Sequence, residues 1–562
     1  MSAARQAMHA GEAVAEALRE EGVERVYSVP GSHIHPIYDG LSRVKSIRFI
    51  TCKQEPNVSL MADAYGRLTG KPGVCLVTAG PGGLNSMAGV AQAYGAASPM
   101  VHIGGAVPLK ADREAFHGVD DPAFVNEMFK KITKWSARIE RMEDIPGTMA
   151  KAFHIARSGR PGPVHVELPR VSDYSEYILQ EERAVLPPYQ PIPTVVTEPD
   201  AGDVDHFAKR LMEARAPVIA AGKGIVRKRA TKELAELANR LQAPVITAQD
   251  AIGVIPEDHP FFAGHFQHYR SYPLCVEALK QTDLIIGIGL RAGTAELAEL
   301  RERAPEKNLI LIGFEDAPDS RYSGEDQRVA DPKLFLTALL ARLGSYQRPR
   351  DEARIREMAE GKAKMRAGLV AQAAPHRDDR PIHPGVLMDA MNAVLDDDTM
   401  LASDVGNCQM WTRTYRRIAH PESFMQSGVW NAMSFGLPTA MVAKMEFPER
   451  NVVAIAGDGA FLMTSGDLST AAEYGANILA IVMNNGTFGQ TFMQQTNIYG
   501  HTYGTTFKSP HFADLAKACG CAGIRVSDPA EVEGALREAV AATKHQPALL
   551  EVVVADRPYP KI

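Results

Sequence analysis

Two apolar runs in the last third of the chain each end in a polar turn, and this pattern restricts the fold more than any other feature. Val452-Val453-Ala454-Ile455-Ala456 leads into Gly457-Asp458-Gly459, and Ile478-Leu479-Ala480-Ile481-Val482-Met483 leads into Asn484-Asn485. Short runs that are apolar throughout are typical of strands buried on both faces of a parallel sheet. We therefore expect both polar turns at the carboxyl edge of one open α/β sheet, where ligands bind.

The residues in these two turns have the chemistry of a magnesium and phosphate site. The carboxylate of Asp458 and the amide oxygen of Asn485 are hard ligands, and such ligands suit Mg²⁺, which tends to keep substrate phosphates in its coordination shell. Glycines beside Asp458 let backbone N–H groups come close to a phosphate. A Gly-Asp-Gly sequence alone is equally consistent with a plain turn after a strand, but the second polar turn favours the metal–diphosphate interpretation.

The length of the chain, 562 residues, suggests three domains rather than one. A proline-rich segment at 186–199 and a highly charged segment at 346–384 separate the parts that carry regular patterns. We therefore predict domains at residues 1–185, 195–345 and 380–562. Short apolar runs alternate with amphipathic stretches in each part, so the predicted fold class is α/β, with three doubly wound parallel-sheet domains.

Charge and composition limit the classes of partner and location. The net charge is −6, so nothing suggests binding to nucleic acid. The N-terminus has no apolar signal core, and no uncharged run reaches the length of a membrane span. The six cysteines are scattered without a Cys-x-x-Cys pair, which is typical of buried free thiols in a reducing compartment. We expect a cytoplasmic protein whose partners are small molecules.

The two polar turns resemble the cofactor motif of thiamine diphosphate enzymes, and similarity continues along most of the chain. The pattern looks closest to the acetolactate synthase and pyruvate oxidase family. This resemblance implies a pyrimidine-binding, a central and a diphosphate-binding domain, with thiamine diphosphate and Mg²⁺ as cofactors. Family members place the cofactor between the first domain of one subunit and the third domain of its neighbour, which implies a homodimer or homotetramer.

The family resemblance implies which residues of this chain bind the metal and the cofactor. The implied metal ligands are the side chains of Asp458 and Asn485 and the backbone carbonyl of Thr487. Met433 occupies the position that props the cofactor into a V shape, and Asn431 stands where relatives usually carry glycine. The full set implied to contact the cofactor is Pro30, Gly31, Glu55, Asn85, Asn407, Cys408, Asn431, Met433, Gly457, Asp458, Gly459, Ala460, Asn485, Thr487, Phe488 and Gly489.

Glu55 is the implied activator of the cofactor. It follows the apolar run 47–50, and residues 61–73 after it match the family pattern, although Gln54 replaces the usual histidine. In the family this glutamate hydrogen-bonds N1′ of the aminopyrimidine, and desolvation should raise its pKa. A solvated glutamate at a helix start is the plain alternative.

Three further side chains are catalytic candidates. His33 lies in a loop similar to that of benzaldehyde lyase, where a histidine handles protons near the substrate; a structural histidine is the alternative. His117 lies near where relatives place a glutamine close to the reacting carbon. Gln490 belongs to the segment expected to approach the substrate. The tryptophan that acetolactate synthases usually carry near Met493 is absent.

The function implied is that of a lyase or carboligase that decarboxylates or cleaves a 2-oxo acid or 2-hydroxy ketone. The resulting enamine is transferred to an acceptor ketone or aldehyde. One alternative is an FAD-dependent 2-oxo acid oxidase, and another is a non-catalytic cofactor-binding homologue. For the central domain, Gly222-Lys223-Gly224, 287–291 and the partly matching 312–316 leave three options open: bound FAD, an ADP-like ligand or no ligand. The donor and acceptor substrates stay undetermined.

Overall fold

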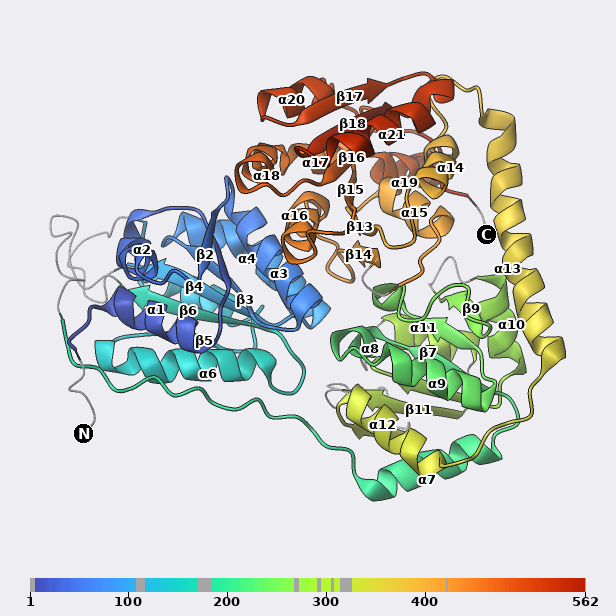
Figure 1. Cartoon of the computed structure of the whole chain (residues 1–562), viewed down its shortest axis with the longest axis horizontal. Helices are drawn as coiled ribbons and strands as arrows, with labels where there is room; N and C mark the ends of the chain where they lie inside the picture. The colour runs from blue at the N-terminus through green and yellow to red at the C-terminus, as the bar shows by residue number, and fades with distance from the viewer. Residues whose placement is uncertain are drawn as a thin grey trace. The chain divides into compact units, whose positions relative to one another are not determined.

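The computed structural model confirms the predicted α/β fold class. It describes residues 6–107, 117–169, 183–266, 272–290, 295–304, 308–313, 326–420 and 423–560. Within these ranges, three six-stranded sheets follow one another along the chain (Figure 1). Neighbouring strands run parallel in all three sheets, so each sheet must be covered by helices on both faces.

The first sheet has the strand order β2-β1-β3-β4-β6-β5. Its strands are β1 (Arg25–Ser28), β2 (Arg48–Thr51), β3 (Gly73–Val77), β4 (Met100–Ala106), β5 (Ser136–Arg138) and β6 (Pro163–Pro169). On one face, α3 (Glu55–Thr69) packs against α4 (Pro81–Ala96); on the other, α1 (Ala10–Glu20) packs against α2 (His35–Ser42) and α6 (Ile145–Arg157). The short helix α5 (Phe124–Phe129) precedes β5, and a 3₁₀ turn, Ser32–Ile34, follows β1.

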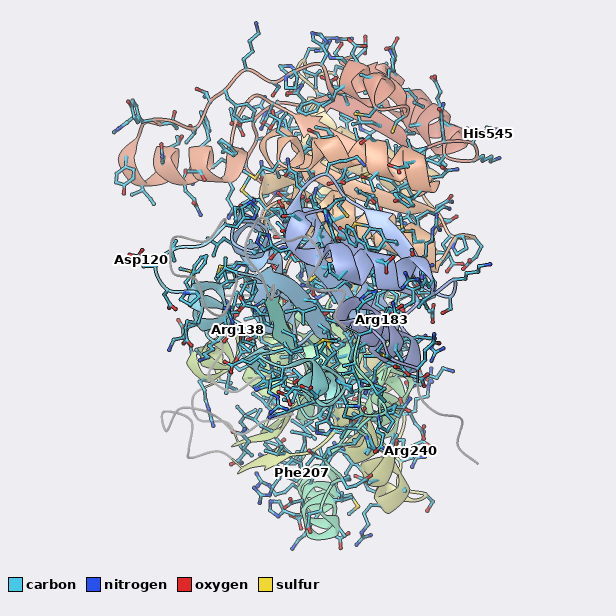
Figure 2. All side chains as sticks on the ribbon, turned by 90° about the vertical axis from the view of Figure 1, so that its left-hand side faces the viewer. Asp120, Arg138, Arg183, Phe207, Arg240 and His545 are labelled. Atoms are coloured by element: carbon cyan, nitrogen blue, oxygen red, sulfur yellow. The ribbon has the colours of Figure 1, made fainter. Side chains whose placement is uncertain are left out.

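The central sheet has the order β12-β11-β10-β7-β8-β9. Its strands are β7 (Pro217–Ala221), β8 (Val245–Thr247), β9 (Phe262–His265), β10 (Leu284–Ile288), β11 (Asn308–Gly313) and β12 (Asp326–Val329). Its helices are α7 (Ala201–Glu213), α8 (Lys223–Arg227), α9 (Thr231–Leu241), α10 (Pro273–Gln281), α11 (Ala295–Arg303) and α12 (Pro332–Leu343). Phe207 of α7, labelled in Figure 2, is fully buried and packs edge-on against Phe335 of α12.

The third sheet has the order β14-β13-β15-β16-β18-β17. Its strands are β13 (Met400–Ser403), β14 (Phe424–Gln426), β15 (Val452–Gly457), β16 (Leu479–Asn484), β17 (Ala522–Val526) and β18 (Ala548–Val553). The helices in this part are α13 (Glu352–Ala373), α14 (Pro384–Val394), α15 (Asn407–Tyr415), α16 (Gly436–Glu446), α17 (Asp458–Leu462), α18 (Leu468–Tyr474), α19 (Gly489–Tyr499), α20 (Phe512–Ala518) and α21 (Val532–Ala542). The two strands predicted before the polar turns are β15 and β16.

The chain forms two compact units by its internal contacts. One contains residues 1–195 together with 429–447 and 463–476, so α16 and α18 pack with the first sheet and its helices. The other contains residues 196–428, 448–462 and 477–562. The predicted domain bounds at 1–185, 195–345 and 380–562 stay predictions.

The strand order of each sheet marks a place where a ligand could bind. The winding direction reverses between β1 and β3 in the first sheet, between β7 and β10 in the central sheet and between β13 and β15 in the third. Ligands of open α/β sheets bind outside the carboxyl ends of the strands at such a reversal. The residues that follow the two strands at each reversal are therefore the ones placed to bind a ligand.

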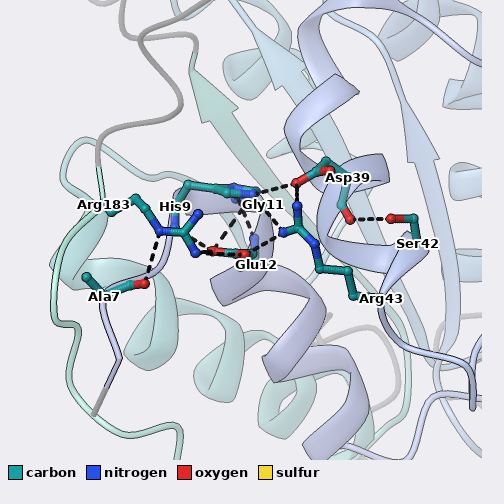
Figure 3. Close-up of polar contacts among 8 residues, drawn as sticks. All are labelled: Ala7, His9, Gly11, Glu12, Asp39, Ser42, Arg43 and Arg183. Atoms are coloured by element: carbon teal, nitrogen blue, oxygen red, sulfur yellow. Dashed lines mark hydrogen bonds and ion pairs between the residues drawn. The ribbon is translucent and has the colours of Figure 1, made fainter. Parts of the chain in front are cut away.

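A polar network fixes the start of α1 (Figure 3). His9 is the N-cap, and its Nδ1 accepts hydrogen bonds from backbone N–H groups of the first turn, while Glu12 accepts one from the His9 N–H at 3.0 Å. His9 Nε2 lies 2.8 Å from Asp39 and therefore carries the proton. Arg43 and Arg183 both bind Glu12. The network ties α1 to α2 and to the segment that follows β6.

Candidate functional site

Asp458 is the centre of the predicted metal site. Its side chain is fully buried at the carboxyl end of β15. One carboxylate oxygen accepts hydrogen bonds from the N–H groups of Asn485 (3.2 Å) and Gly486 (2.7 Å), and the other accepts one from the N–H of Gly459 (2.9 Å). Burial raises the pKa of Asp458, and these hydrogen bonds oppose the rise. The ends of β15 and β16 are thus joined through this carboxylate.

The loop after β16 presents the other predicted ligands. Asn485 Oδ1 accepts a hydrogen bond from the Thr487 N–H at 3.1 Å, which fixes the turn between them. The loop pairs with residues 505–507, because Phe488 N–H donates to Thr505 O and Phe507 N–H donates to Gly486 O. That pairing brings in Ser509, whose hydroxyl donates to Asp458 at 2.8 Å. Ser509 lies in an irregular segment, so no sequence pattern predicts it.

A second carboxylate, Asp556, also reaches this loop. It accepts a hydrogen bond from the Thr487 hydroxyl at 3.1 Å and lies 3.5 Å from the side-chain nitrogen of Asn485. Burial raises the pKa of Asp556, the Thr487 hydrogen bond opposes the rise, and the nearby Asp458 charge adds to it. Asp556 follows β18 at the same edge of the sheet, which is the signal that could have identified it.

The local structure fits a magnesium diphosphate group. The donors are carboxylate, amide and carbonyl oxygens, which Mg²⁺ prefers. A Cβ built on Gly406, which follows β13, or on Gly457 would meet no atom within 4 Å. Open space therefore borders the backbone where phosphates would lie. At Gly459, by contrast, a Cβ would clash with the ring of Phe488.

Glu55 is the first residue of α3 and is half-buried. Its carboxylate accepts a hydrogen bond from Asn85 of α4 at 3.3 Å. The chain on both sides of Glu55 is anchored by the buried carboxylate of Asp467, which accepts from the Lys53 N–H at 2.9 Å and from the side chain of Asn57. Asp467 was missed by sequence reasoning, because it lies far along the chain. It fixes where the first turn of α3, and hence Glu55, is placed.

His33 and His117 stack on each other, with ring centroids 5.1 Å apart and 28° between the planes. His33 lies in the 3₁₀ turn after β1, next to the loop with Pro30 and Gly31, and His117 lies in the connection after β4. Burial lowers the pKa of His117. His117 has φ = 67°, and a Cβ on Gly80 would lie 2.2 Å from its carbonyl oxygen. The two predicted histidines are thus brought together at one edge of the first sheet.

The remaining predicted residues are distributed as follows. Asn431 is exposed with φ = 55°, a conformation that asparagine tolerates better than other non-glycine residues; this explains asparagine where relatives carry glycine. Met433 is partly buried, and Ala460 lies buried in α17. Cys408 is buried, and burial raises the pKa of its thiol to about 12, so the thiol is protonated at neutral pH. Gly489, Gln490 and Met493 lie in α19.

Glycines of the central sheet have a packing explanation. A Cβ on Gly222 would lie 2.3 Å from the carbonyl oxygen of Gly289, and the Gly224 N–H donates to that same oxygen at 2.9 Å. The turns after β7 and β10 therefore need glycine to touch each other, whether or not a nucleotide binds. Arg291 and the residues of 314–316 lie outside the described residues.

A chain of buried polar groups leads from α4 to strands β4 and β6 of the first sheet. Ser86, which follows Asn85, lies 2.7 Å from His102 Nε2, and His102 Nδ1 lies 2.8 Å from His165 Nδ1. His165 Nε2 is 3.5 Å from Glu167. Burial lowers the pKa of His165 to about 3 and raises the pKa of Glu167 to about 8. These groups are therefore neutral at pH 7.

The pKa of Glu167 predicts an unusual pH dependence of stability. An acid with a raised folded-state pKa stabilises the fold below its unfolded pKa, near 4.5, and loses that contribution as pH rises through about 8. The difference in free energy of unfolding between wild type and Glu167→Gln should therefore fall by up to about 1.4 kcal/mol per pH unit in this window. Urea denaturation at pH 5, 6, 7 and 8 measures it.

The groups that face Glu167 are the same in both proteins and set the pKa that the variant removes. They are Arg138 of β5, labelled in Figure 2 and 3.6 Å away, His165 on the same strand, the negative charge of Asp121 and the backbone of Asn126. The exposed Glu127→Gln variant is the control and should show no such trend. A difference that stays constant from pH 5 to 8 contradicts the assignment of a buried, protonated Glu167.

Comparison with known proteins gives a consistent match along the chain. Models of thiamine pyrophosphate enzymes match residues 8–124 (N-terminal TPP binding domain), 204–339 (central domain) and 404–552 (C-terminal TPP binding domain). A probable acetolactate synthase large subunit of Methanocaldococcus jannaschii is 33% identical over 97% of this chain and 92% of its own length. An acetolactate synthase of Mycobacterium bovis is 31% identical (98% and 88%), and the acetolactate synthase isozyme 3 large subunit of Escherichia coli is 30% identical (97% and 94%).

Proposed function

The chain belongs to the thiamine pyrophosphate enzymes, in the family that contains the acetolactate synthase large subunits, and from this premise we propose its reaction. The proposed activity is that of a thiamine diphosphate- and Mg²⁺-dependent carbon–carbon lyase or carboligase. Its donor is a 2-oxo acid or a 2-hydroxy ketone, and its acceptor is a ketone or an aldehyde. The names of the relatives favour a carboligase over an FAD-dependent oxidase.

The observation that carries the proposal is the environment of Asp458. This fully buried carboxylate accepts the backbone N–H of Asn485 and so lies between the ends of two adjacent strands, at the edge where open α/β sheets bind their ligands. In the proposed site Asp458, Asn485 and the Thr487 carbonyl bind Mg²⁺, and backbone groups near Gly406 and Gly457 approach the diphosphate. Met433 would hold the cofactor in its V shape.

Bound thiamine diphosphate supplies the electron sink for breaking a bond beside a carbonyl group. Glu55 would hold a proton at N1′ of the pyrimidine, which requires a carboxylate fixed at that position. Asp467 and Asn85 provide the fixation, because they bind the chain around Glu55 and its carboxylate, respectively. The half-buried position of Glu55 in the described chain is compatible with this role.

His33 and His117 are the proposed proton carriers on the substrate side. Burial lowers the pKa of His117, and an imidazole of a stacked pair can accept a proton from one group and return it to another. The loop that follows β16 and holds Asn485 and Thr487 is called the metal loop. Gln490 and Met493 lie in α19, directly after it, and are proposed to contact the substrate. Met493 is smaller than the tryptophan that acetolactate synthases usually carry near this position, so we propose an acceptor bulkier than pyruvate.

We propose a homodimer or homotetramer as the assembly, which rests on the family resemblance. A cytoplasmic location is proposed from the thiols, since the buried cysteines Cys52, Cys75, Cys275 and Cys408 form no disulfide. Among the described residues, no helix combines the length and the apolar character needed to cross a bilayer.

Products formed from pyruvate test the proposed function. The protein is incubated with pyruvate, thiamine diphosphate and Mg²⁺, with and without an aromatic aldehyde, and the products are identified by mass spectrometry. Acetolactate or a mixed acyloin is the expected result. No product from pyruvate would exclude pyruvate as donor, and no product from a panel of larger 2-oxo acids and 2-hydroxy ketones would contradict the lyase assignment.

A further inference from the structure

The segment after the last strand crosses the carboxyl edge of the third sheet. Val554 pairs with Ile382, and the Ala555 N–H donates to the carbonyl of Ile382 at 2.8 Å. The next residue, Asp556, reaches the loop after β16, and the carbonyl of Arg557 accepts a hydrogen bond from the side chain of Asn407 at 3.0 Å. Residues 554–557, the C-terminal strap, therefore connect the loops that follow β13 and β16.

Asp556 contacts two of the three proposed metal ligands. Its Oδ2 accepts a hydrogen bond from the hydroxyl of Thr487 at 3.1 Å, and its Oδ1 lies 3.5 Å from the side-chain nitrogen of Asn485. A carboxylate attracts the N–H₂ end of an amide. The amide oxygen of Asn485 must then point away from Asp556, which is the orientation that a metal ligand needs.

Gly489 gives independent support for this arrangement. A Cβ at that position would lie 3.2 Å from both Asn485 Nδ2 and Asp556 Oδ1, closer than side chains ordinarily pack. A glycine at the first position of α19 therefore leaves space for these two groups to approach each other. The backbone there leaves room for the contact between strap and loop, which any larger residue would crowd.

We propose that Asp556 is a positioning residue for the metal centre, acting through Asn485 and Thr487 rather than as a ligand. The C-terminal strap then couples the loop that follows β16 to Asn407, one of the residues implied to contact the cofactor. This inference rests on the proposed function, because it assumes that the loop binds Mg²⁺. The strap lies beyond residues 404–552, which the C-terminal TPP binding domain model matches.

Magnesium binding by strap variants tests the proposal. Mg²⁺ is titrated into the full-length protein with saturating thiamine diphosphate, and binding is followed by calorimetry and by quenching of tryptophan fluorescence. Removing a group that orients metal ligands typically costs 10- to 100-fold in metal affinity, so we expect Asp556→Ala to raise the half-saturating Mg²⁺ concentration by about tenfold or more. Asp556→Asn should cost less, because its amide can still accept from Asn485 and donate to Thr487.

Arg557→Ala is the matched control. It removes the side chain that pairs with Asp379 at 3.1 Å but keeps the carbonyl that binds Asn407, so it should bind Mg²⁺ as the wild type does.

Wild-type affinity in Asp556→Ala overturns the proposal. Equal losses in Asp556→Ala and Asp556→Asn also overturn it, because the charge would then act directly, and an equal loss in Arg557→Ala would assign the effect to the strap as a whole. A wild-type protein that binds no Mg²⁺ with the cofactor overturns the proposed function as well.

Discussion

The Glu55→Gln variant is expected to turn over about 10²- to 10⁴-fold more slowly than the wild-type enzyme, while it still binds thiamine diphosphate and Mg²⁺. Glutamine preserves the size of the side chain and its contact with Asn85, but it cannot share a proton as a carboxylate can. The groups that bind the diphosphate and metal are unchanged. The variant therefore separates cofactor activation from cofactor binding.

Two measurements test the role of Glu55 without knowledge of the natural substrate. Exchange of the cofactor's C2 proton for deuterium, followed by acid quenching and proton NMR, reports activation without any substrate. Calorimetry reports binding of the cofactor. Glu473→Gln is the control, because it removes an exposed carboxylate that pairs with Lys53 in the same region. Wild-type exchange and turnover in Glu55→Gln would show that Glu55 is only a helix-start glutamate.

The strands that carry the site are predictable because each is buried on both faces. β15 and β16 read as uninterrupted apolar runs, and the residue after each run falls at the ligand-binding edge. The order of the strands within a sheet could not be predicted from such apolar runs. Edge strands such as β5, with the residues Ser136–Arg138, have no apolar run and pair only because the sheet continues beyond β6. Their position follows from tertiary contacts rather than from local pattern.

The parts of the site that sequence reasoning missed have one property in common. Ser509, Asp467 and Asp556 act on residues of other segments, and no sequence motif assigned any of them to the site. Hydrogen bonds from such residues depend on how distant loops meet, as when the metal loop pairs with residues 505–507. Motif reasoning identifies groups that contact a ligand directly; the groups that orient them become visible only when the fold is known.

Replacing Asp458 by asparagine is expected to weaken Mg²⁺ binding by more than about 100-fold, because a direct ligand should matter more than a group that only orients one. The carboxylate accepts N–H donors on both of its oxygens, from Gly459 on one and from Asn485 and Gly486 on the other. An amide has only one acceptor oxygen. Its N–H₂ group must therefore face at least one backbone N–H, which costs about 1–3 kcal/mol as an unsatisfied buried group.

Titration of Mg²⁺ in the presence of thiamine diphosphate measures the loss, with Asp514→Asn as the control. Asp514 is exposed, lies in the same sheet region and pairs with Lys517, so it should leave Mg²⁺ affinity unchanged. The two aspartates of the site should also differ from each other. Asp556→Asn keeps its hydrogen bonds and loses little, whereas Asp458→Asn loses both the ligand charge and a hydrogen-bond acceptor. Equal losses in the two variants would mean that both carboxylates bind the metal directly, and unchanged affinity in Asp458→Asn would place the metal elsewhere.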